Sequence, residues 1–138
     1  MSGRFNDTIV SKGQEVLDEM RFASSALVQA VLLSDDGFEV TRTPRIGESD
    51  GRFASMASSV QALSEAVIHE LRIGTGDAMI IQASEGLVVQ ARVGTHPAVV
   101  SALFRTDESL GKCLVVTRRA TAALEEALSE GGVSLGSD

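Results

Sequence analysis

The 138-residue chain contains no tryptophan or tyrosine, has one cysteine, and lacks a long uncharged apolar run. A single cysteine excludes an internal disulfide and a cysteine-based zinc site. Without a long apolar run, a membrane span is not expected. The absence of tryptophan and tyrosine removes the usual stacking platforms for single-stranded nucleic acid. Because the N-terminus also lacks a signal-peptide core, we expect a cytoplasmic protein.

Charge further restricts the partners. Nineteen acidic residues against twelve basic ones give a formal net charge of −7. Such a field repels phosphate backbones and anionic lipid, so neither nucleic acid nor membrane insertion is expected. The composition of 43% hydrophobic and 22% charged residues is typical of a soluble globular protein. We therefore expect one domain over residues 1–138, with a core at about 6–129 and a flexible tail at 130–138.

Apolar periodicity, capping residues and turn signals predict eight secondary-structure elements. They are a helix over 5–22 capped by Asn6 or Asp7, strands over 26–33 and 38–41, a helix from a Ser49 or Asp50 cap to about 71, strands over 77–83, 87–93 and 98–105, and a helix over 110–129. An Asp-Gly turn joins the first two strands, so we expect a mainly antiparallel sheet. Residues 26–33 are apolar on both faces of their strand. Helices must therefore cover both sides of the sheet, one on one face and two on the other.

No constellation of residues predicts catalysis or metal binding. His69 and His96 have no partner at metal-ligand spacing. The acidic residues at 35–36 lack the further ligands of a calcium loop. Residues 111–113 (Gly-Lys-Cys) resemble the end of a phosphate-binding loop, but Thr106 stands in place of its earlier glycine and Cys113 in place of its Ser or Thr. Cys113 is interpreted as a small buried residue rather than a nucleophile. We expect no catalytic residues, no metal, no cofactor, and no catalysis by this chain alone.

The second predicted helix carries two stripes. The first is apolar, is interpreted as the side that faces the core, and consists of Phe53, Met56, Val60, Leu63, Val67 and Leu71. The second, the small-residue stripe, consists of Ser55, Ser58, Ser59, Ala62, Ala66 and His69. Small side chains let another helix approach closely, which favours a helix-helix contact. The alternative is a solvated face rich in serine and alanine.

The strand after this helix provides a second candidate contact. It contains Asp77, Ala78, Met79, Ile80, Ile81 and Gln82. At a sheet edge, it would expose unpaired amides flanked by apolar side chains. Pairing with the same strand of a second copy would cover these groups and build a twofold interface.

A family resemblance rests on three segments in order. Residues 30–38 (AVLLSDDGF), the Ala/Ser-rich second helix, and the Ser-Leu-Gly at 109–111 resemble the roadblock/dynein light chain family over about residues 6–129. The similarity is greatest to bacterial members, which regulate small Ras-like GTPases. The resemblance implies an α/β (α+β), profilin-like fold with a five-stranded, mainly antiparallel sheet between helices in the order α-β-β-α-β-β-β-α. It also implies a homodimer formed through the second helix and third strand.

The resemblance further implies a function. It points to a non-enzymatic homodimeric regulatory or scaffold protein that binds a small Ras-like GTPase and modulates or reads its nucleotide state. The rim expected to meet that partner consists of Arg45, Glu48, Ser49, Arg52 and Met56. Arg118 and Arg119 are interpreted as surface charges rather than an arginine finger. The alternative function is a small-molecule sensory module of profilin-like or PAS-like type, against which the scarcity of inward polar residues weighs.

Overall fold

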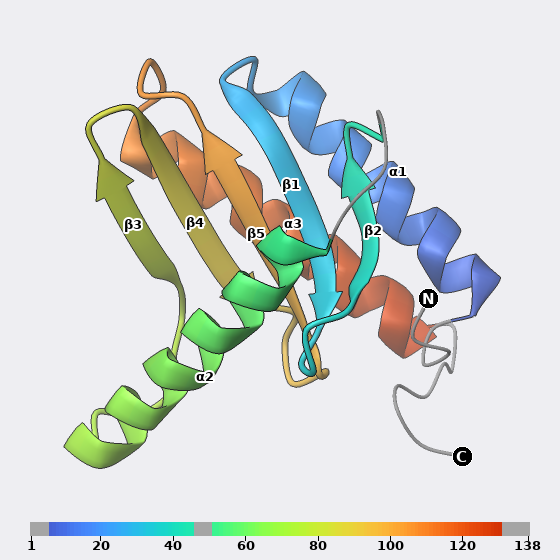
Figure 1. Ribbon diagram of the computed structural model, residues 1–138. Helices are drawn as coiled ribbons and strands as arrows, with labels where there is room; N and C mark the ends of the chain where they lie inside the picture. Colours follow the sequence, from blue (N-terminus) through green and yellow to red (C-terminus); the bar gives the residue numbers. More distant parts are fainter. Residues whose placement is uncertain (1–5, 46–50, 131–138) are drawn as a thin grey trace.

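A computed structural model describes residues 6–45 and 51–130 of the chain (Figure 1). The elements are α1 (Asp7–Ala23), β1 (Leu27–Ser34), β2 (Glu39–Thr43), α2 (Arg52–Leu71), β3 (Met79–Ala83), β4 (Gly86–Arg92), β5 (Ala98–Phe104) and α3 (Leu110–Glu130). The predicted order of helices and strands is confirmed. The Asn6 side chain caps α1 by accepting a hydrogen bond from the Ile9 amide at 2.9 Å, as its position predicted.

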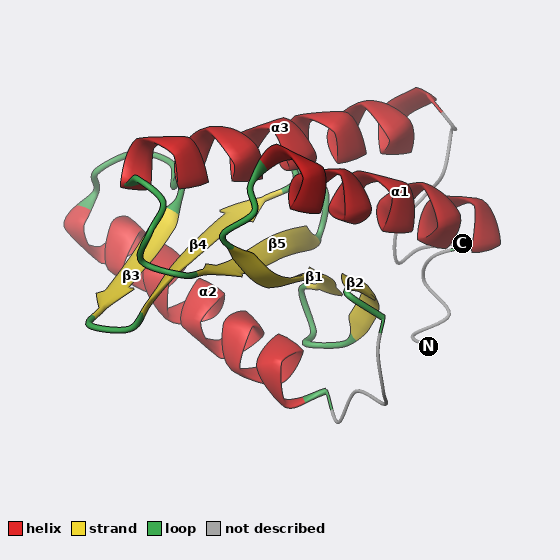
Figure 2. Cartoon of the chain, turned by 90° about the horizontal axis from the view of Figure 1, so that it is seen from above, coloured by secondary structure: helices red, strands yellow, loops and turns green. Residues whose placement is uncertain are grey.

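The five strands form one sheet in the order β2-β1-β5-β4-β3, and all neighbouring strands are antiparallel. The sheet places β2 at one edge and β3 at the other. Helices α1 and α3 lie on one face, and α2 lies on the other (Figure 2). This arrangement confirms the predicted layers. It follows from β1 and β5, whose residues are buried almost throughout and therefore need cover on both sides.

The two faces of the sheet bury very different amounts of apolar surface. The larger cluster fills the space between the sheet and the helices α1 and α3, and includes the fully buried Leu17 and Phe104. Cys113 belongs to this cluster, as its sequence position predicted. The cluster under α2 has only five buried members, namely Val31, Leu33, Ala54, Ala57 and Val99. Most of the apolar burial therefore comes from the α1 and α3 side.

Helix α1 also covers the edge of the sheet at β2 (Figure 1). The Gln14 side-chain amide donates to the Arg42 carbonyl at 2.9 Å and to the Asp18 carboxylate at 3.0 Å. The Thr43 hydroxyl donates to Asp18 at 2.7 Å, and the Thr41 hydroxyl donates to Gln14. Of these groups, only the Arg42 carbonyl belongs to the strand backbone, and Gln14 occupies this one acceptor at the edge.

The start of α2 differs from its prediction. Its N-cap is Gly51, in a left-handed conformation with φ 73° and without a side-chain capping bond. The predicted caps Ser49 and Asp50 do not occupy that position, and both lie outside the described residues. Glycine adopts this conformation without steric cost, so the turn into the helix is set by the backbone rather than by a capping side chain. The predicted tail also lies outside the described residues, apart from Glu130, which ends α3.

Two adjacent valines of α3 differ in burial, so the same substitution at each one tests the packing of the larger cluster. Val116 is 2% exposed and Val115 is 45% exposed. We expect Val116→Ala to lower the free energy of unfolding by about 1–3 kcal/mol, because it removes buried apolar groups and leaves a cavity. Val115→Ala should change it by less than about 0.5 kcal/mol, helped by the helix propensity of alanine. Chemical denaturation of both variants measures the difference, and equal losses would contradict this packing.

Candidate functional site

The first half of α2 is fixed closely to the sheet. Ala54 and Ala57 are buried, and their small side chains bring the helix near β1 and β5. Gln90, which is 2% exposed on β4, donates to the Ala57 carbonyl at 2.8 Å and to the Gln61 side-chain oxygen at 3.1 Å. The Ser58 hydroxyl donates to the carbonyl of Asp35 at 2.7 Å. These contacts orient α2 through its first three turns.

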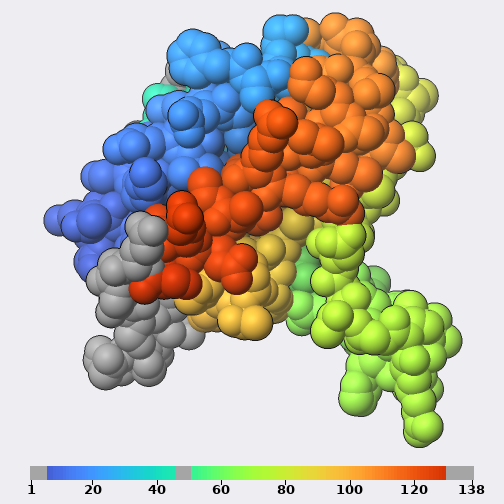
Figure 3. Space-filling view, turned by 180° about the vertical axis from the view of Figure 1, so that it is seen from behind, coloured from blue at the N-terminus to red at the C-terminus, as the bar shows by residue number. Residues whose placement is uncertain are grey.

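Arg92 of β4 forms an ion pair with α2, one turn beyond the contact of Gln90 with Gln61. Its guanidinium lies 2.7 Å from the Glu65 carboxylate of α2 and 3.2 Å from the Asp35 carboxylate, and it donates to the His96 carbonyl at 2.9 Å. The pKa of Glu65 is lowered by the hydrogen bond from Gln61 and then by Arg92. Beyond this ion pair, the end of α2 projects from the body of the molecule (Figure 3).

The interpretation of the apolar stripe of α2 as its core face is wrong. Leu63 is 67% exposed and Leu71 is 61% exposed, and Met56 and Val67 are exposed as well. Only Phe53 packs on the cluster beneath the helix, and Val60 is half-buried. At about 100° per residue, this stripe lies roughly a third of a turn from the buried alanines. Periodicity reveals an apolar face, but it does not show what covers that face.

The edge strand β3 also exposes apolar side chains. It pairs with β4 and has no strand on its other side in the sheet. Ile80 and Ile81 are 38% and 45% exposed, and the preceding Ile73 is also exposed. We call the combined area the α2–β3 surface. It consists of Met56, Leu63, Val67, Leu71, Ile73 and Ile81, whereas Ile80 faces the other side of the sheet, because its cross-strand neighbour Val89 belongs to the core under α1 and α3.

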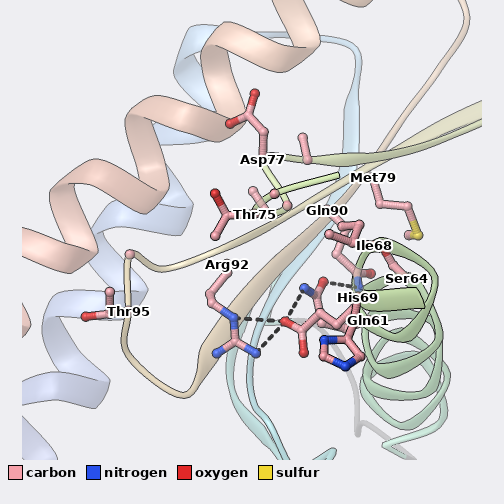
Figure 4. A pocket seen from close by; sticks show the side chains of 16 residues that line it. Gln61, Ser64, Ile68, His69, Thr75, Asp77, Met79, Gln90, Arg92 and Thr95 are labelled. Carbon is pink, nitrogen blue, oxygen red and sulfur yellow. Dashed lines mark hydrogen bonds and ion pairs between the residues drawn. The ribbon is translucent and has the colours of Figure 1, made fainter. Parts of the chain in front are cut away.

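A groove of about 620 Å³ separates the projecting half of α2 from β3 and β4 (Figure 4). Polar residues of α2 and β4 line it, and several of them bind one another. Gln61 contacts Gln90, and Glu65 contacts Arg92. Asp77, at the entrance to β3, pairs with Arg118 of α3. The groove is therefore polar where it meets the sheet and borders the apolar α2–β3 surface.

The residues predicted for a homodimer contact lie on α2 and around β3. Ser58 is half-buried and bonded to the β1–β2 turn, while Ala78 and Met79 are half-buried at the groove. The others are exposed, namely Ser55, Ser59, Ala62, Ala66, His69, Asp77, Ile80, Ile81 and Gln82. The sequence pattern did not reveal that the apolar stripe is exposed, because it was interpreted as the core face. Their proposed role in assembly remains a prediction.

The predicted partner rim is spread over different elements. Arg52 and Met56 are exposed on the first turns of α2. Arg45 instead contacts Gln14 of α1 and Thr41 of β2. The two remaining rim residues, Glu48 and Ser49, lie outside the described residues.

Other candidate chemistry is limited. Within residues 6–45 and 51–130, no group of three or more His, Cys, Asp or Glu side chains is arranged to hold a metal ion. Burial raises the pKa of the Cys113 thiol, and the nearby Glu108 raises it further. Arg118 holds α3 to the start of β3 through Asp77, while Arg119 is exposed. None of the described helices combines the length and the apolar character needed to cross a membrane.

The Glu65–Arg92 ion pair predicts a pH-dependent effect. Folding lowers the pKa of Glu65, so the ionised carboxylate contributes stability above about pH 4.5. This contribution is lost as the pH falls through the folded-state pKa of Glu65. We expect Glu65→Gln to reduce the free energy of unfolding by under about 1 kcal/mol at pH 7, since the pair is partly exposed. The difference from wild type should be smaller at pH 3 than at pH 7. Urea denaturation at both pH values measures it, with the exposed Glu70→Gln as control, and an undiminished difference at low pH would contradict the assignment.

Comparison with known proteins agrees with this architecture. No protein-family model matches the chain, and no curated protein sequence matches it significantly. Among solved structures, Myxococcus xanthus MglB is similar with a TM-score of 0.81 and 14% identity, covering 91% of this chain and 93% of that one. A Roadblock/LC7 domain from Streptomyces avermitilis has a TM-score of 0.76 and 15% identity, covering 83% and 96%. Acanthamoeba castellanii profilin IA has a TM-score of 0.52 and 13% identity, covering 83% and 97%. The chain therefore has the α+β, profilin-like fold of roadblock/LC7 domains, as the sequence resemblance implied.

Proposed function

We propose that this chain is a homodimeric, non-enzymatic regulatory or scaffold protein that binds a small Ras-like GTPase. The observation that carries the proposal is the α2–β3 surface, where exposed apolar side chains adjoin an unpaired strand edge. Exposed apolar side chains beside an open strand edge are typical of interaction sites in soluble proteins. Its location on a roadblock fold favours assembly of two copies through α2 and β3.

The geometry of the two sheet edges supports a twofold dimer. At β2 the edge is occupied by Gln14 and α1, whereas β3 remains open. Antiparallel pairing of two β3 strands would satisfy their free backbone groups and cover Ile80 and Ile81. It would also bring the projecting half of α2 close to the second copy. A helical segment without tertiary packing is marginally stable in water, so cover from the partner copy would stabilise it.

Both stripes of α2 have a place in this dimer. The apolar stripe, including Leu63 and Val67, supplies the area that association removes from water. The small-residue stripe, including Ala62 and Ala66, allows close approach of the partner backbone at its border. Substitutions at Leu63 and Ala62 therefore separate the two contributions.

The GTPase assignment rests on the resemblance to bacterial roadblock proteins together with the fold. In a dimer, the first turns of the two α2 helices, near Arg52 and Met56, would form one composite docking rim. Regulation requires different affinities for the two nucleotide states, because a ligand shifts a switch only by differential binding. This protein could stimulate hydrolysis, promote exchange or act as a scaffold. In each case, GTP would be hydrolysed in the GTPase's own active site.

The sensory alternative would use the groove of about 620 Å³ beneath α2. Its main polar groups already bind one another through Gln61, Gln90, Glu65 and Arg92. A small polar ligand would have to displace these contacts. The groove also borders the surface proposed for the dimer, so the observations favour the regulatory function.

Assembly is tested by charge insertion into the α2–β3 surface. We expect the wild type to be a dimer at micromolar concentration, and Leu63→Glu to weaken dimerisation by about 2–4 kcal/mol, because the carboxylate would be buried without a partner. Ala62→Arg should weaken it by a similar amount through overpacking and charge burial. Light scattering and sedimentation equilibrium measure both effects. The control is Val115→Glu, on α3 outside this surface, which should remain dimeric; a monomeric wild type would contradict the proposal.

Partner binding is tested with a small Ras-like GTPase from the same genome. We expect the dimer to bind the GTPase loaded with a non-hydrolysable GTP analogue at least about tenfold more tightly than the GDP form, or roughly 1.4 kcal/mol. Arg52→Glu, at the docking rim and outside the α2–β3 surface, should weaken binding, whereas Val115→Glu should not. Isothermal titration calorimetry measures each affinity. Equal affinity for the two states would leave only a scaffold, and no binding would remove the GTPase assignment.

A further inference from the structure

Helix α2 covers only part of its face of the sheet. Cross-strand neighbours point to the same face, so their side chains form rows across the strands. One row contains Ser101 and Gln90, which are both buried, and Gln90 is bonded to the first half of α2. Two residues along each strand, the next row on this face contains Leu103, Val88 and Ile81. We call these three residues the open row.

Contacts along β4 explain why α2 leaves this row open. Gln90 donates to the carbonyl of Ala57 in the helix, whereas Arg92, two residues further from the open row, pairs with Glu65. The helix therefore runs away from Val88 as it proceeds along the chain. No described helix covers the open row from the α2 side of the sheet (Figure 1).

The open row is apolar and accessible. Leu103 and Val88 are half-buried, and Ile81 is 45% exposed. Their rings of neighbours are the strands themselves, so a further apolar group could pack on top of them. Such a group would remove the remaining exposed area of the row from water.

The far end of α2 has the complementary property. Leu71 is 61% exposed and Ile73 is 64% exposed, and this end projects from the body of the molecule (Figure 3). A short connection then leads to Met79, the first residue of β3. The end of α2 therefore lies near the start of β3, whereas Ile81 of the open row lies toward the end of that strand.

Twofold symmetry relates these two uncovered regions. Antiparallel pairing of two β3 strands within one continuous sheet requires a twofold axis perpendicular to the sheet. This axis keeps both α2 helices on the same face and places the start of one β3 strand beside the end of the other. It therefore brings the projecting end of α2 in one copy to the open row of the other copy.

We propose that the end of α2 in each copy packs on the open row of its partner, with Leu71 and Ile73 of one copy against Val88 and Ile81 of the other. This exchange rests on the homodimer proposed above and identifies which residues of each copy the other one covers. It occurs twice by symmetry and removes apolar side chains of both copies from water. The occupant is a second copy because the axis that pairs the open β3 edges also supplies the cover.

Cross-linking between two differently marked chains tests the contact. One chain carries Leu71→Cys, and the other carries Val88→Cys and a larger affinity tag, so mixed dimers have their own gel mobility. We expect oxidation, or a short bismaleimide, to give a covalent mixed dimer, because a disulfide needs the two Cα atoms within about 7 Å. Ile73→Cys with Ile81→Cys should give a second such dimer.

Two controls accompany this experiment. Leu71→Cys mixed with Val115→Cys should give no covalent dimer, because α3 lies on the opposite face of the sheet from α2. Wild-type protein measures the background from the native Cys113, which is buried. Peptide mass spectrometry identifies the linked residues.

A double-mutant cycle measures the same contact without cysteines. We expect Leu71→Ala and Val88→Ala each to weaken dimerisation at least about fivefold, because each removes apolar area from the interface. The double variant should weaken it by less than the product of the two single effects, since the two side chains contact each other across the dimer. Val115→Ala should leave dimerisation unchanged. Sedimentation equilibrium measures all four dissociation constants.

The possible results separate this contact from the dimer itself. A wild type that is dimeric, but gives neither covalent dimer and shows independent effects of Leu71 and Val88, would overturn the exchange and leave the homodimer standing. The open row would then be free for a different protein. A monomeric wild type would overturn both. If circular dichroism shows that Val88→Ala does not fold, the cysteine pair at the exposed positions 73 and 81 decides the question.

Discussion

The packing of the first half of α2 on the sheet is the constraint on which the rest of the structure depends. Ala54 and Ala57 let the helix approach β1 and β5, and Gln90 fixes it by hydrogen bonds to the helix backbone and to Gln61. The Arg92–Glu65 ion pair adds a last anchor. Since all these contacts lie in the first two thirds of the helix, its end has no comparable cover. The exposed apolar stripe follows directly from this geometry.

The two edges of the sheet have opposite properties because different elements adjoin them. Helix α1 runs beside β2, and Gln14 occupies one backbone acceptor of that strand, the Arg42 carbonyl. No described helix covers β3 in this way, and its isoleucines remain accessible on both faces. An open apolar edge is a liability in a soluble protein unless a specific partner covers it. The two edges therefore differ in cover: α1 lies beside β2, and β3 is the more open edge.

Charge divides the surface in a similar way. Some arginines form ion pairs that join separate elements of the fold. Arg92, for example, pairs with Glu65 and Asp35. Arg21 and Arg45 lie where α1 meets the end of β2, and the acidic neighbour Asp18 is bound by uncharged donors. Carboxylates lie close to these two guanidinium groups, because Asp18 borders the same groove and Glu108 accepts a hydrogen bond from the groove residue Ser24.

The sequence by itself determined the order of the elements, the antiparallel sheet, and the resemblance to roadblock proteins. Turn residues, the Asn6 cap and apolar strands act locally, so they are visible along the chain. Only the tertiary structure decided which side of α2 is buried, because the stripe that contains Leu63 has the periodicity of a core face and yet is largely exposed, while Ala57, outside both stripes, is buried. It also brought Arg21 and Arg45 together from positions 24 residues apart (45 − 21). Burial and long-range contact depend on how helices cross the sheet, and periodicity along one helix carries no information about that crossing.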